Sequence, residues 1–562
     1  MSIIVANAKE QIKNIIIEAA KASIADNSLE SAEIGDFAIE VPANRTHGDY
    51  AVNAAMVWAR AFHKAPRQIA EILMQHANFS GSYIKSFEIA GPGFINLFLN
   101  DNYYSDILKD VENKGADYGK SDFGKGKKIL VEFVSANPTG PMHIGNARGG
   151  ALGDCLAAVL EAAGYYTERE FYINDAGNQI NKFGLSLDLR YLQLYKDGIE
   201  MPEDSYHGED IIDHAKAFAE IHGDSYVNAT EEERRKALVE FALPKNIQGL
   251  EQDLAKYRIK YDTWFKESTL HNNGEATRII ELLKQSGYTY EEEGALWFKA
   301  TEFGCDKDFV LVRANGFPTY VVPDIAYHYN KLEIRKFDKA IDILGADHHG
   351  YVPRLKAALT ALGVDADRLD VVLMQMVRLV KEGEVIKASK RSGKAITLVT
   401  LLDEVPIDAA RFFFNLREPN SHFDFDLDLA VNESNSNPVY YVQYAYARIC
   451  SIIRNLEAEG INNRKCTDDE LNLLVLPEEK ELILHIAALT DEIILSAKTY
   501  DPARITHYVQ ELATKFHKFY SACRVKGDDE GLMQARLTLC KATATVIKNL
   551  LTLMKIEAPE KM

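Results

Sequence analysis

The spacing of apolar residues along the chain changes several times and predicts different elements in different stretches. In residues 1–115, helical spacing over residues 9–25 and 51–77 is followed by a strand-like close, SFEIAGPGFINLFLN. Residues 128–182 predict a strand, a loop, a helix and a second strand in that order. Strands that alternate with helices favour βαβ units and a parallel sheet.

The rest of the chain is mostly helical in pattern. Residues 183–300 are highly charged, and we expect them to form a helical insertion. Strand-like runs return in DFVLVRANGFPTYVVPD and AIDILGADHHG, before a helical carboxyl-terminal part. We therefore expect a multidomain α/β protein with a small α/β domain over residues 1–115, a parallel-sheet domain over residues 116–430 and an all-α domain over residues 431–562.

Composition narrows the class of protein. The 562 residues are 47 % apolar and 26 % charged, as in ordinary globular chains. No apolar run reaches the about 18 residues of a membrane-spanning helix, and the first residues lack the apolar core of a signal peptide. The six cysteines lie far apart without C-x-x-C spacing, so we expect reduced thiols, a cytoplasmic location and no structural metal.

The chain is acidic, with a formal charge of −19 from 64 Lys and Arg against 83 Asp and Glu. This balance argues against a protein that coats nucleic acid nonspecifically, because such a protein needs a basic surface. It leaves specific RNA binding open, since that depends on local basic surface.

A Pro- and Gly-rich loop joins the first strand of the parallel-sheet domain, residues 128–135, to a helix, and it carries His143, Gly145 and Asn146. Loops at the carboxyl ends of parallel strands bind ligands in α/β sheets. The helix N-terminus offers N–H groups and a positive dipole end to phosphate. The loop therefore indicates a nucleotide site, and the alternative is a simple strand–helix turn.

Two further segments carry candidate chemistry. Residues 387–394 read KASKRSGK, in which lysines can act as mobile charges on phosphate; the alternative is a basic surface loop. In GFPTYVVPDIAYHYNK, Tyr320 ends a strand-like run, and Pro323 and Asp324 open a helix. The helix dipole should keep Asp324 ionised, and a helix-capping Asp is the simplest alternative.

Both signatures resemble those of a known family. NPTGPMHIGNARG resembles the HIGH signature of class I aminoacyl-tRNA synthetases, and the wider VEFVSANPTGPMHIGNARGGALGD resembles the arginyl branch. KASKR is similar to the KMSKS loop, with Ala388 in place of Met, and Asn146 stands where the family has its second His. The resemblance implies a Rossmann-like catalytic domain that binds ATP with Mg²⁺ and carries no structural metal. The implied ATP-binding residues are Pro141, His143, Gly145, Asn146, Lys387, Ser389 and Lys390, of which His143, Asn146, Lys387 and Lys390 are also the implied catalytic residues.

The same resemblance implies an arginine site. In arginyl synthetases, a Tyr and an Asp at the spacing of Tyr320 and Asp324 hold the guanidinium, which reverses the preference for a simple cap. A site that hydrogen-bonds a whole guanidinium should reject lysine strongly. The other residues that match substrate-lining positions are Glu132, Ser135, Asn137, Asp347 and His348, with Ser135 and Asn137 facing the α-amino group.

Two terminal segments resemble the tRNA-binding parts of arginyl synthetases. THGDYAVNAAM resembles the additional N-terminal domain and implies tRNA contacts by Asp49, Tyr50 and Asn53. NPVYYVQYAYARI resembles the anticodon-binding helical domain and implies contacts by Gln443, Tyr444 and Arg448. The alternatives are a domain packed for stability alone and an aromatic helix buried in a core.

The resemblance thus implies an enzyme that joins L-arginine to tRNA(Arg) in two steps, through an arginyl-adenylate, and that often needs tRNA for the first step. We expect a monomer without membrane association. Two alternatives stay open. One is a class I synthetase for another amino acid, although zinc ligands and an editing insertion are missing from the sequence. The other is an RNA-binding relative that has lost catalysis. Only Asn146 and Ala388, which depart from the two family signatures, favour this alternative.

Overall fold

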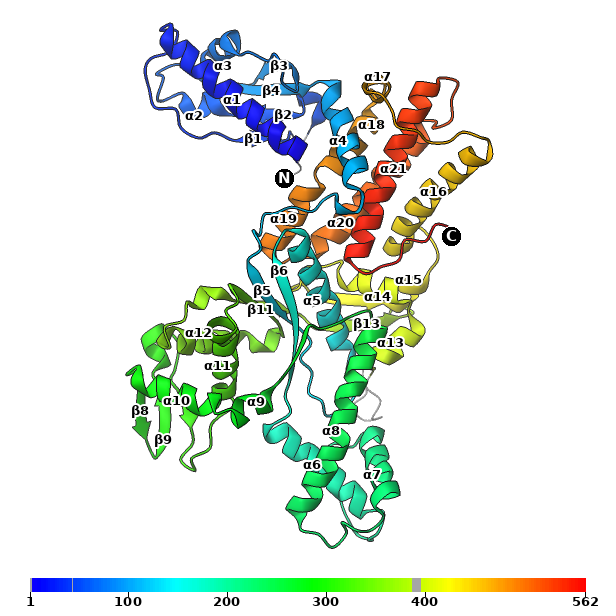
Figure 1. Ribbon diagram of the computed structural model, residues 1–562. Helices are drawn as coiled ribbons and strands as arrows, with labels where there is room; N and C mark the ends of the chain where they lie inside the picture. Colours follow the sequence, from blue (N-terminus) through cyan, green and yellow to red (C-terminus); the bar gives the residue numbers. More distant parts are fainter. Residues whose placement is uncertain (1–2, 43, 387–395) are drawn as a thin grey trace.

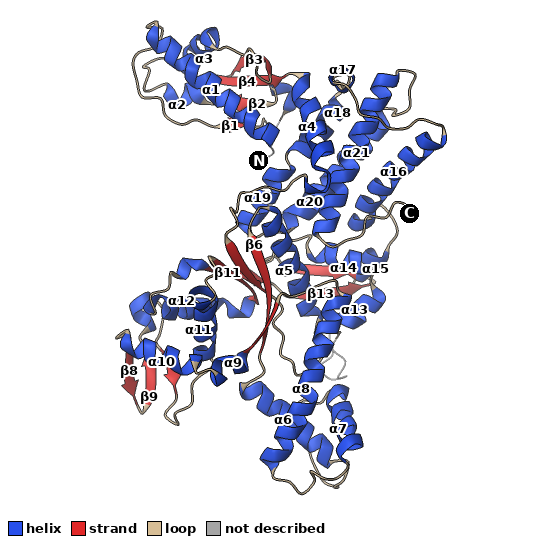
Figure 2. Ribbon diagram, viewed as in Figure 1, coloured by secondary structure: helices blue, strands red, loops and turns tan. Residues whose placement is uncertain are grey.

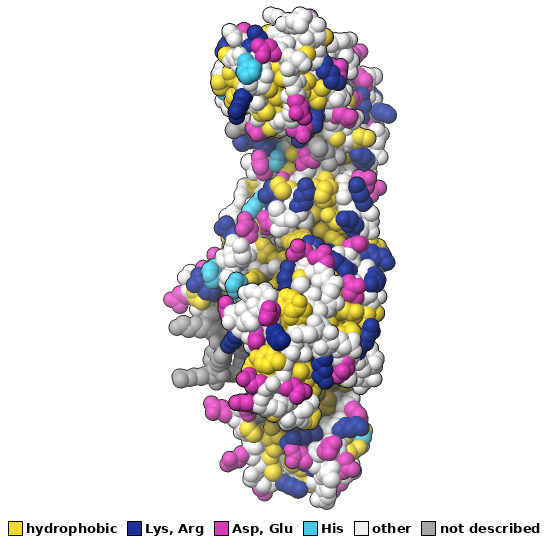
Figure 3. Space-filling model, turned by 90° about the vertical axis from the view of Figure 1, so that its left-hand side faces the viewer, with side chains coloured by type: hydrophobic (Ala, Val, Ile, Leu, Met, Phe, Trp, Pro, Cys, Tyr) yellow, Lys and Arg dark blue, Asp and Glu magenta, His cyan; other side chains and the backbone are white. Residues whose placement is uncertain are grey.

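The computed structural model describes residues 3–42, 44–386 and 396–562. The molecule is elongated, with the N-terminal domain at one end, a unit of three helices at the other and a parallel sheet between them (Figure 1). In the described ranges, no helix is both long and apolar enough to cross a membrane. On the face shown in Figure 3, acidic and basic side chains are interspersed.

The N-terminal domain is an antiparallel sheet, ordered β1-β2-β4-β3, covered by helices. Residues 51–77 do not form one continuous helix as expected. Tyr50 and Val52 pair with β4 and both point into the core, so this part is a strand, and Pro66 starts a separate helix. The elements are α1 (Ile3–Ala25), β1 (Ile39–Glu40), β2 (Tyr50–Val52), α2 (Ala54–Trp58), α3 (Pro66–His76), β3 (Ile84–Ala90), β4 (Phe94–Leu99) and α4 (Asp101–Lys114).

A parallel sheet of order β12-β11-β5-β6-β7 forms the centre of the molecule. Helix α5 lies on one side of it, and α11 and α12 lie on the other (Figure 2). Its elements are β5 (Lys128–Glu132), α5 (Ile144–Ala162), β6 (Tyr166–Ile173), β7 (Thr263–Lys266), α11 (Val321–Tyr329), β11 (Lys339–Gly345), α12 (Val352–Ala361) and β12 (Leu369–Met374).

The segment expected to be one helical insertion, residues 183–300, is divided by β7. Helices α6 (Gly177–Leu192), α7 (Glu209–His222) and α8 (Glu231–Lys256) form a unit with its own apolar core. The chain then returns to the central sheet, where β7 pairs with β6. Strand β7 has only four residues, too few for a recognisable period, so the sequence pattern hides it.

The remaining elements of the central domain extend the sheet region on both sides. A small antiparallel sheet has the order β10-β9-β8, and another has the order β14-β13-β15. The elements are α9 (Glu267–Asn272), α10 (Glu275–Gln285), β8 (Thr289–Glu292), β9 (Ala295–Phe298), β10 (Phe309–Val312), β13 (Val377–Lys381), β14 (Glu384–Val385), α13 (Leu398–Glu404), α14 (Ile407–Phe414), β15 (Phe423–Asp426) and α15 (Leu427–Val431).

The carboxyl-terminal part is helical, as expected, and it packs against α4 and α5. Its helices share one continuous apolar core with the N-terminal domain and with α5. They are α16 (Pro438–Ala458), α17 (Asp468–Leu471), α18 (Pro477–Ala487), α19 (Leu489–Thr499), α20 (Ala503–Ala522) and α21 (Glu530–Leu553).

Candidate active site

The two central strands of the parallel sheet, β5 and β11, mark the place where its strand order reverses. From β5 the chain crosses through α5 to β6 on one side, while β11 pairs with β5 on the other side. In open α/β sheets, ligands bind at the carboxyl ends of the strands that flank such a switch point. The loops after β5 and β11 carry most of the candidate residues.

The turn after β5 is unusual. The strand was expected to run to Ser135, but it ends at Glu132 because Val134 and Ser135 have φ angles of 71° and 41°. The backbone N–H of Ser135 donates to the carbonyl of Phe133 at 3.0 Å, which makes a tight turn centred on Val134. Positive φ at a β-branched residue is strained, and such strain concentrates at functional sites.

His143 is the N-cap of α5, so the HIGH-like loop does lead into a helix N-terminus. The Asn146 side-chain oxygen accepts a hydrogen bond from the His143 backbone N–H at 3.2 Å. Pro141 and His143 are exposed, and Gly145 and Asn146 are half-buried. Asn146 therefore shapes the loop, a role that does not need the charge of a histidine.

Helix α5 packs unusually close to β5. A Cβ atom on Gly153 would lie 2.2 Å from the Phe133 ring, so only glycine permits this approach. This close packing places the N-terminus of α5 directly over the carboxyl end of the sheet, where a phosphate would meet the helix dipole.

The two signatures, far apart in the sequence, are connected through backbone hydrogen bonds. The Ile144 N–H donates to the Ile396 carbonyl at 3.1 Å, and the Leu398 N–H donates to the Met142 carbonyl at 2.9 Å. Thr397 forms an isolated antiparallel bridge with His143. Lys387, Ser389 and Lys390 lie outside the described residues, but the chain that follows them is bound to the HIGH-like loop.

Arg148, which sequence reasoning missed, strengthens this connection. It is buried in α5, and its guanidinium donates to the carbonyls of Gln375, Ser421 and Glu418 at 2.8, 3.1 and 2.9 Å. Burial lowers the pKa of Arg148 to about 10. Gln375 lies between β12 and β13, the strand that leads toward the second signature, so Arg148 ties α5 to that part of the chain.

Asp324 lies in the first turn of α11, as expected, and the Tyr351 hydroxyl donates to its carboxylate at 2.5 Å. Burial raises the pKa of Asp324 to about 6, so burial outweighs the helix dipole that was expected to keep it strongly ionised. Tyr320 is 68 % exposed at the N-cap, with its ring centroid 6.0 Å from that of Tyr351. The Tyr320 ring is thus presented to solvent beside Tyr351.

Glu132 is buried at the end of β5, and both of its carboxylate oxygens have partners. One accepts from the Ser135 hydroxyl at 2.8 Å, and the other accepts from the Lys331 ammonium at 2.5 Å. The Ser135 hydroxyl in turn accepts from the Tyr172 N–H at 3.1 Å. The substrate-lining residues of β5 are therefore held in a hydrogen-bond network.

Glu267 was not singled out from the sequence. It is the first residue of α9, just beyond the hidden strand β7, and only 9 % of it is exposed. Burial raises its pKa, and the buried Tyr172 hydroxyl has its pKa raised by burial and by the carboxylates of Glu267 and Asp324. The buried Glu267 and the half-buried Asp324 therefore both act on the same hydroxyl, an arrangement of carboxylates suited to a cation.

Asn137, Asp347 and His348 reach the same edge of the sheet as exposed residues. Asn137 follows the turn after β5, and the other two lie in a short helical turn directly after β11. The His348 imidazole and the Asp347 carboxylate are 3.9 Å apart. All three can approach a ligand from the solvent side.

The side chains of the N-terminal domain that were expected to contact tRNA make contacts within that domain. Tyr50 is only 4 % exposed, and its hydroxyl lies 3.3 Å from that of Tyr103, so its side chain packs in the core of the domain. Asp49 accepts from the Tyr104 hydroxyl at 2.9 Å, and the Asn53 side chain accepts a backbone N–H at 2.8 Å. These side chains hold the domain together.

The expected contacts on α16 divide into two kinds. Gln443 donates to the Asp408 carboxylate at 3.0 Å and to the Glu557 carbonyl at 2.9 Å, so it joins parts of the protein. The Arg448 guanidinium lies 4.7 Å over the Tyr444 ring and donates to its hydroxyl at 2.6 Å. This half-buried stack is an aromatic and cationic surface of the kind that bases stack on.

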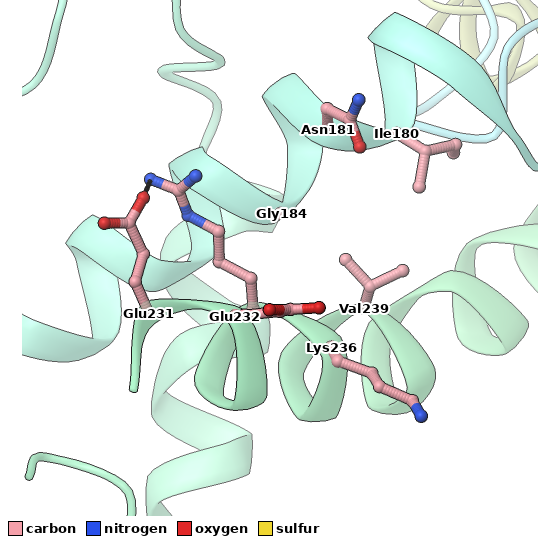
Figure 4. Close-up of a pocket in the computed structure, with 8 residues that line it drawn as sticks. Ile180, Asn181, Gly184, Glu231, Glu232, Lys236 and Val239 are labelled. Atoms are coloured by element: carbon pink, nitrogen blue, oxygen red, sulfur yellow. Dashed lines mark ion pairs between the residues drawn. The ribbon is translucent and has the colours of Figure 1, made fainter. Parts of the chain in front are cut away.

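A surface cavity of about 500 Å³ lies elsewhere, between α6 and α8. Figure 4 shows Ile180 and Val239 on its walls, and Glu231 in an ion pair on α8. None of the residues expected to bind ligand lines this cavity, so the candidate active site remains the carboxyl edge of the sheet.

Comparison with known proteins agrees with this geometry. Family models match over three consecutive ranges: the arginyl-tRNA synthetase N-terminal domain over residues 7–99, the class I (R) tRNA synthetase catalytic domain over residues 108–434 and the DALR anticodon-binding domain over residues 442–562. The catalytic-domain model alone spans more than half of the chain.

Curated relatives and a solved structure match along the whole chain. The arginine–tRNA ligase of Caldanaerobacter subterraneus subsp. tengcongensis is 55 % identical, and that of Acetivibrio thermocellus is 52 % identical, each over 100 % of both chains. The arginyl-tRNA synthetase structure of Thermus thermophilus, 22 % identical, covers 97 % of this chain and 99 % of its own with a TM-score of 0.73, which shows the same fold. The chain therefore belongs to the arginyl-tRNA synthetases, a family of class I aminoacyl-tRNA synthetases.

Proposed function

We propose that this chain joins L-arginine to tRNA(Arg) in two steps through an arginyl-adenylate, consuming ATP and releasing AMP and pyrophosphate. The observation that carries the proposal is the meeting of the loop around His143 with residues 396–398 at the carboxyl edge of the sheet, the same edge that carries the half-buried Asp324. This arrangement unites a nucleotide-type helix N-terminus with a site for a cation.

In the first step, the arginine carboxylate attacks the α-phosphate of ATP, which is taken as its Mg²⁺ complex. We assign His143 and the N-terminus of α5 to the phosphates, and Lys387 and Lys390 to the charge that grows on the leaving pyrophosphate. Pro141, Gly145, Asn146 and Ser389 complete the proposed ATP site. The protein's contribution is to position the two substrates and stabilise charge.

Arginine would bind with its guanidinium at the acidic side chains near α11 and α9 and its α-amino group at the residues that follow β5. We assign Asp324 and Glu267 to the guanidinium, with Tyr320 closing over it, since among the described residues no Lys or Arg forms an ion pair with either carboxylate and His271, 3.4 Å from Glu267, is the one basic neighbour in an ion pair. Ser135 and Asn137 would face the α-amino group. The further proposed lining residues are Glu132, Asp347 and His348. Lysine would leave a buried carboxylate poorly paired, which favours its rejection.

In the second step, the terminal ribose hydroxyl of tRNA attacks the adenylate. We propose that Tyr444 and Arg448 contact the tRNA through base stacking, because their rings and guanidinium form a half-buried stack on α16. We further propose that the enzyme is a cytoplasmic monomer and that tRNA must be present for adenylate formation.

ATP–pyrophosphate exchange with each of the twenty amino acids, with and without total tRNA, tests the proposal. We expect exchange with arginine alone and mainly when tRNA is present. Exchange with another amino acid would overturn the assignment of Asp324 and Glu267. The Lys390→Ala variant should lose exchange, and an unchanged rate would remove this residue from the mechanism.

A further inference from the structure

Three neighbouring strands of the central sheet each place a carboxylate in the same row. Asp342 of β11 is paired with Glu132 of β5, and Glu132 is paired with Glu170 of β6. All three are buried, with exposures of 2, 6 and 0 %. Like charges directly opposite one another on adjacent strands repel, so this row needs positive charge from outside the sheet.

That charge comes from one stripe of α11 and the π-helical turn that continues it, Asn330–Ile334. His328, Lys331 and Arg335 follow Asp324 at helical spacing and therefore share its face. Arg335 pairs with Glu170 at 2.5 Å, and His328 lies 2.6 Å from Asp342. π-helical turns of this kind are frequent at functional sites.

Lys331 occupies the centre of this layer. It is 0 % exposed, and its ammonium donates to Glu132 at 2.5 Å and to Asp342 at 2.8 Å. Glu132, His328 and Asp342 bring ligand atoms within 4.8 Å of one another, as metal ligands do. Here the Lys331 ammonium donates to two of these three side chains, Glu132 and Asp342, so it occupies the position that a metal ion would take.

These contacts form a continuous chain between the two ends of the proposed arginine site. At one end, the His328 imidazole lies 2.7 Å from the backbone carbonyl of Asp324 and contacts Asp342 with its other nitrogen. At the other end, Lys331 holds Glu132, which accepts from the Ser135 hydroxyl. Because Lys331 is fully buried, water has no access to replace it.

We propose that Lys331 is a positioning residue for arginine. Its ammonium fixes the carboxylate of Glu132 against that of Asp342, and through Glu132 it fixes the hydroxyl of Ser135 before the substrate arrives. This inference rests on the proposed arginine site. A group held in place beforehand loses less entropy on binding, so the benefit belongs to arginine and not to ATP.

The double variant Lys331→Gln/Asp342→Asn tests this role, because it removes one charge of each sign and leaves amide groups in both places. We expect the KM for arginine to rise by about 10-fold or more, while the KM for ATP stays within about twofold. A matched control is Lys339→Gln/Asp370→Asn, a pair 2.5 Å apart at the other end of β11. The control should leave both KM values unchanged.

Equal KM values for arginine in the test and control variants would overturn the proposal and leave Lys331 a packing role only. If the double variant does not fold, Lys331→Arg is measured in its place, since it keeps the charge but displaces the donors; an unchanged KM for arginine would again overturn the proposal. Asp324→Asn is measured in parallel. If it leaves the KM for arginine unchanged, the proposed arginine site itself is wrong.

Discussion

Two clusters of largely buried charged side chains surround the central sheet and α5, and their charges are balanced in opposite directions. The α5 cluster has one buried carboxylate, Asp154, among three cations, of which Arg169 also pairs with the exposed Glu161. The substrate-edge cluster has five carboxylates and two side chains that are always cationic. Their members are Asp154, Arg169, Arg411 and Lys555 in the first, and Glu132, Glu170, Glu267, Asp324, Asp342, Lys331 and Arg335 in the second.

In the α5 cluster, the buried carboxylate is paired with cations of the protein itself. Asp154 lies 2.5 Å from Arg411, 2.7 Å from Lys555 and 3.2 Å from Arg169, so it joins α5 to α14, to the carboxyl-terminal segment and to β6. Burial alone would raise the pKa of Asp154, but these cations hold it below its ordinary value. A buried charge whose partners all come from the protein itself is costly to leave unpaired and has no need of a ligand.

In the substrate-edge cluster, Lys and Arg side chains pair with only some of the carboxylates. Lys331 and His328 hold the pKa of Asp342 below its ordinary value against the effect of burial, but burial raises the pKa of Asp324 and Glu267. Among the described residues, no Lys or Arg pairs with Asp324 or Glu267, and the guanidinium of arginine would supply this positive charge. The comparison teaches that the balance of charge, more than burial itself, separates a structural cluster from a binding site.

The largest expected effect is on stability, from Asp154→Asn. Loss of the carboxylate leaves the fully buried Arg411 without a charged partner, so the free energy of unfolding should fall by about 3–5 kcal/mol. Denaturant unfolding of the variant and of the wild type measures this change. The KM for arginine of the folded variant should stay the same. An unchanged unfolding free energy would show that the cluster is not structural.

Asp324→Asn should affect binding instead. We expect kcat/KM for arginine to fall by roughly 30- to 700-fold, or about 2–4 kcal/mol, because the guanidinium loses a buried charged partner. The free energy of unfolding should not decrease, since the surroundings of Asp324 already disfavour its ionised form and an amide can still accept from the Tyr351 hydroxyl. Steady-state aminoacylation and denaturant unfolding test both parts. A stability loss as large as that of Asp154→Asn would remove the distinction between the clusters.

The pH dependence of arginine binding should follow Asp324. Its pKa is raised to about 6, so it takes up a proton in the folded protein at a higher pH than in the unfolded chain. As pH falls through about 6, the carboxylate is neutralised, and the KM for arginine should rise by up to about 10-fold per pH unit. Asp324→Asn serves as the control, in which this part of the profile should be flat.

Lys555→Met should have the smallest effect. Its side chain is 33 % exposed, and Asp154 keeps two arginine partners, so the unfolding free energy should fall by only about 1 kcal/mol. Thermal unfolding compared with Asp154→Asn measures the difference. A loss equal to that of Asp154→Asn would mean that Lys555 alone balances the carboxylate.

Local rules made part of the site predictable from the sequence. The helix after the HIGH-like loop, its N-terminus near His143 and the place of Asp324 in a first helical turn all follow from apolar period and turn residues. The end of β5 was predicted too late. Val134 is a good strand former, and only its tertiary surroundings impose the positive φ that ends the strand.

Buried charges were not predictable. Lys331, Arg148 and Asp154 look like ordinary surface residues in a single sequence, because charged side chains are seldom buried unless partners from distant segments surround them. Glu267 was missed because it follows a strand of only four residues. The burial of Tyr50 could have been predicted, because Tyr50 and Val52 alternate with a less buried residue as in a strand.

The most direct test of the central claim is calorimetric binding of L-arginine and of citrulline, its neutral isostere, to the wild type and to Asp324→Asn. We expect the wild type to prefer arginine by at least about 100-fold and the variant by no more than about 10-fold, since the deficit of positive charge at the substrate edge selects the cation. The same preference in both proteins would contradict the claim that this uncompensated carboxylate recognises the substrate.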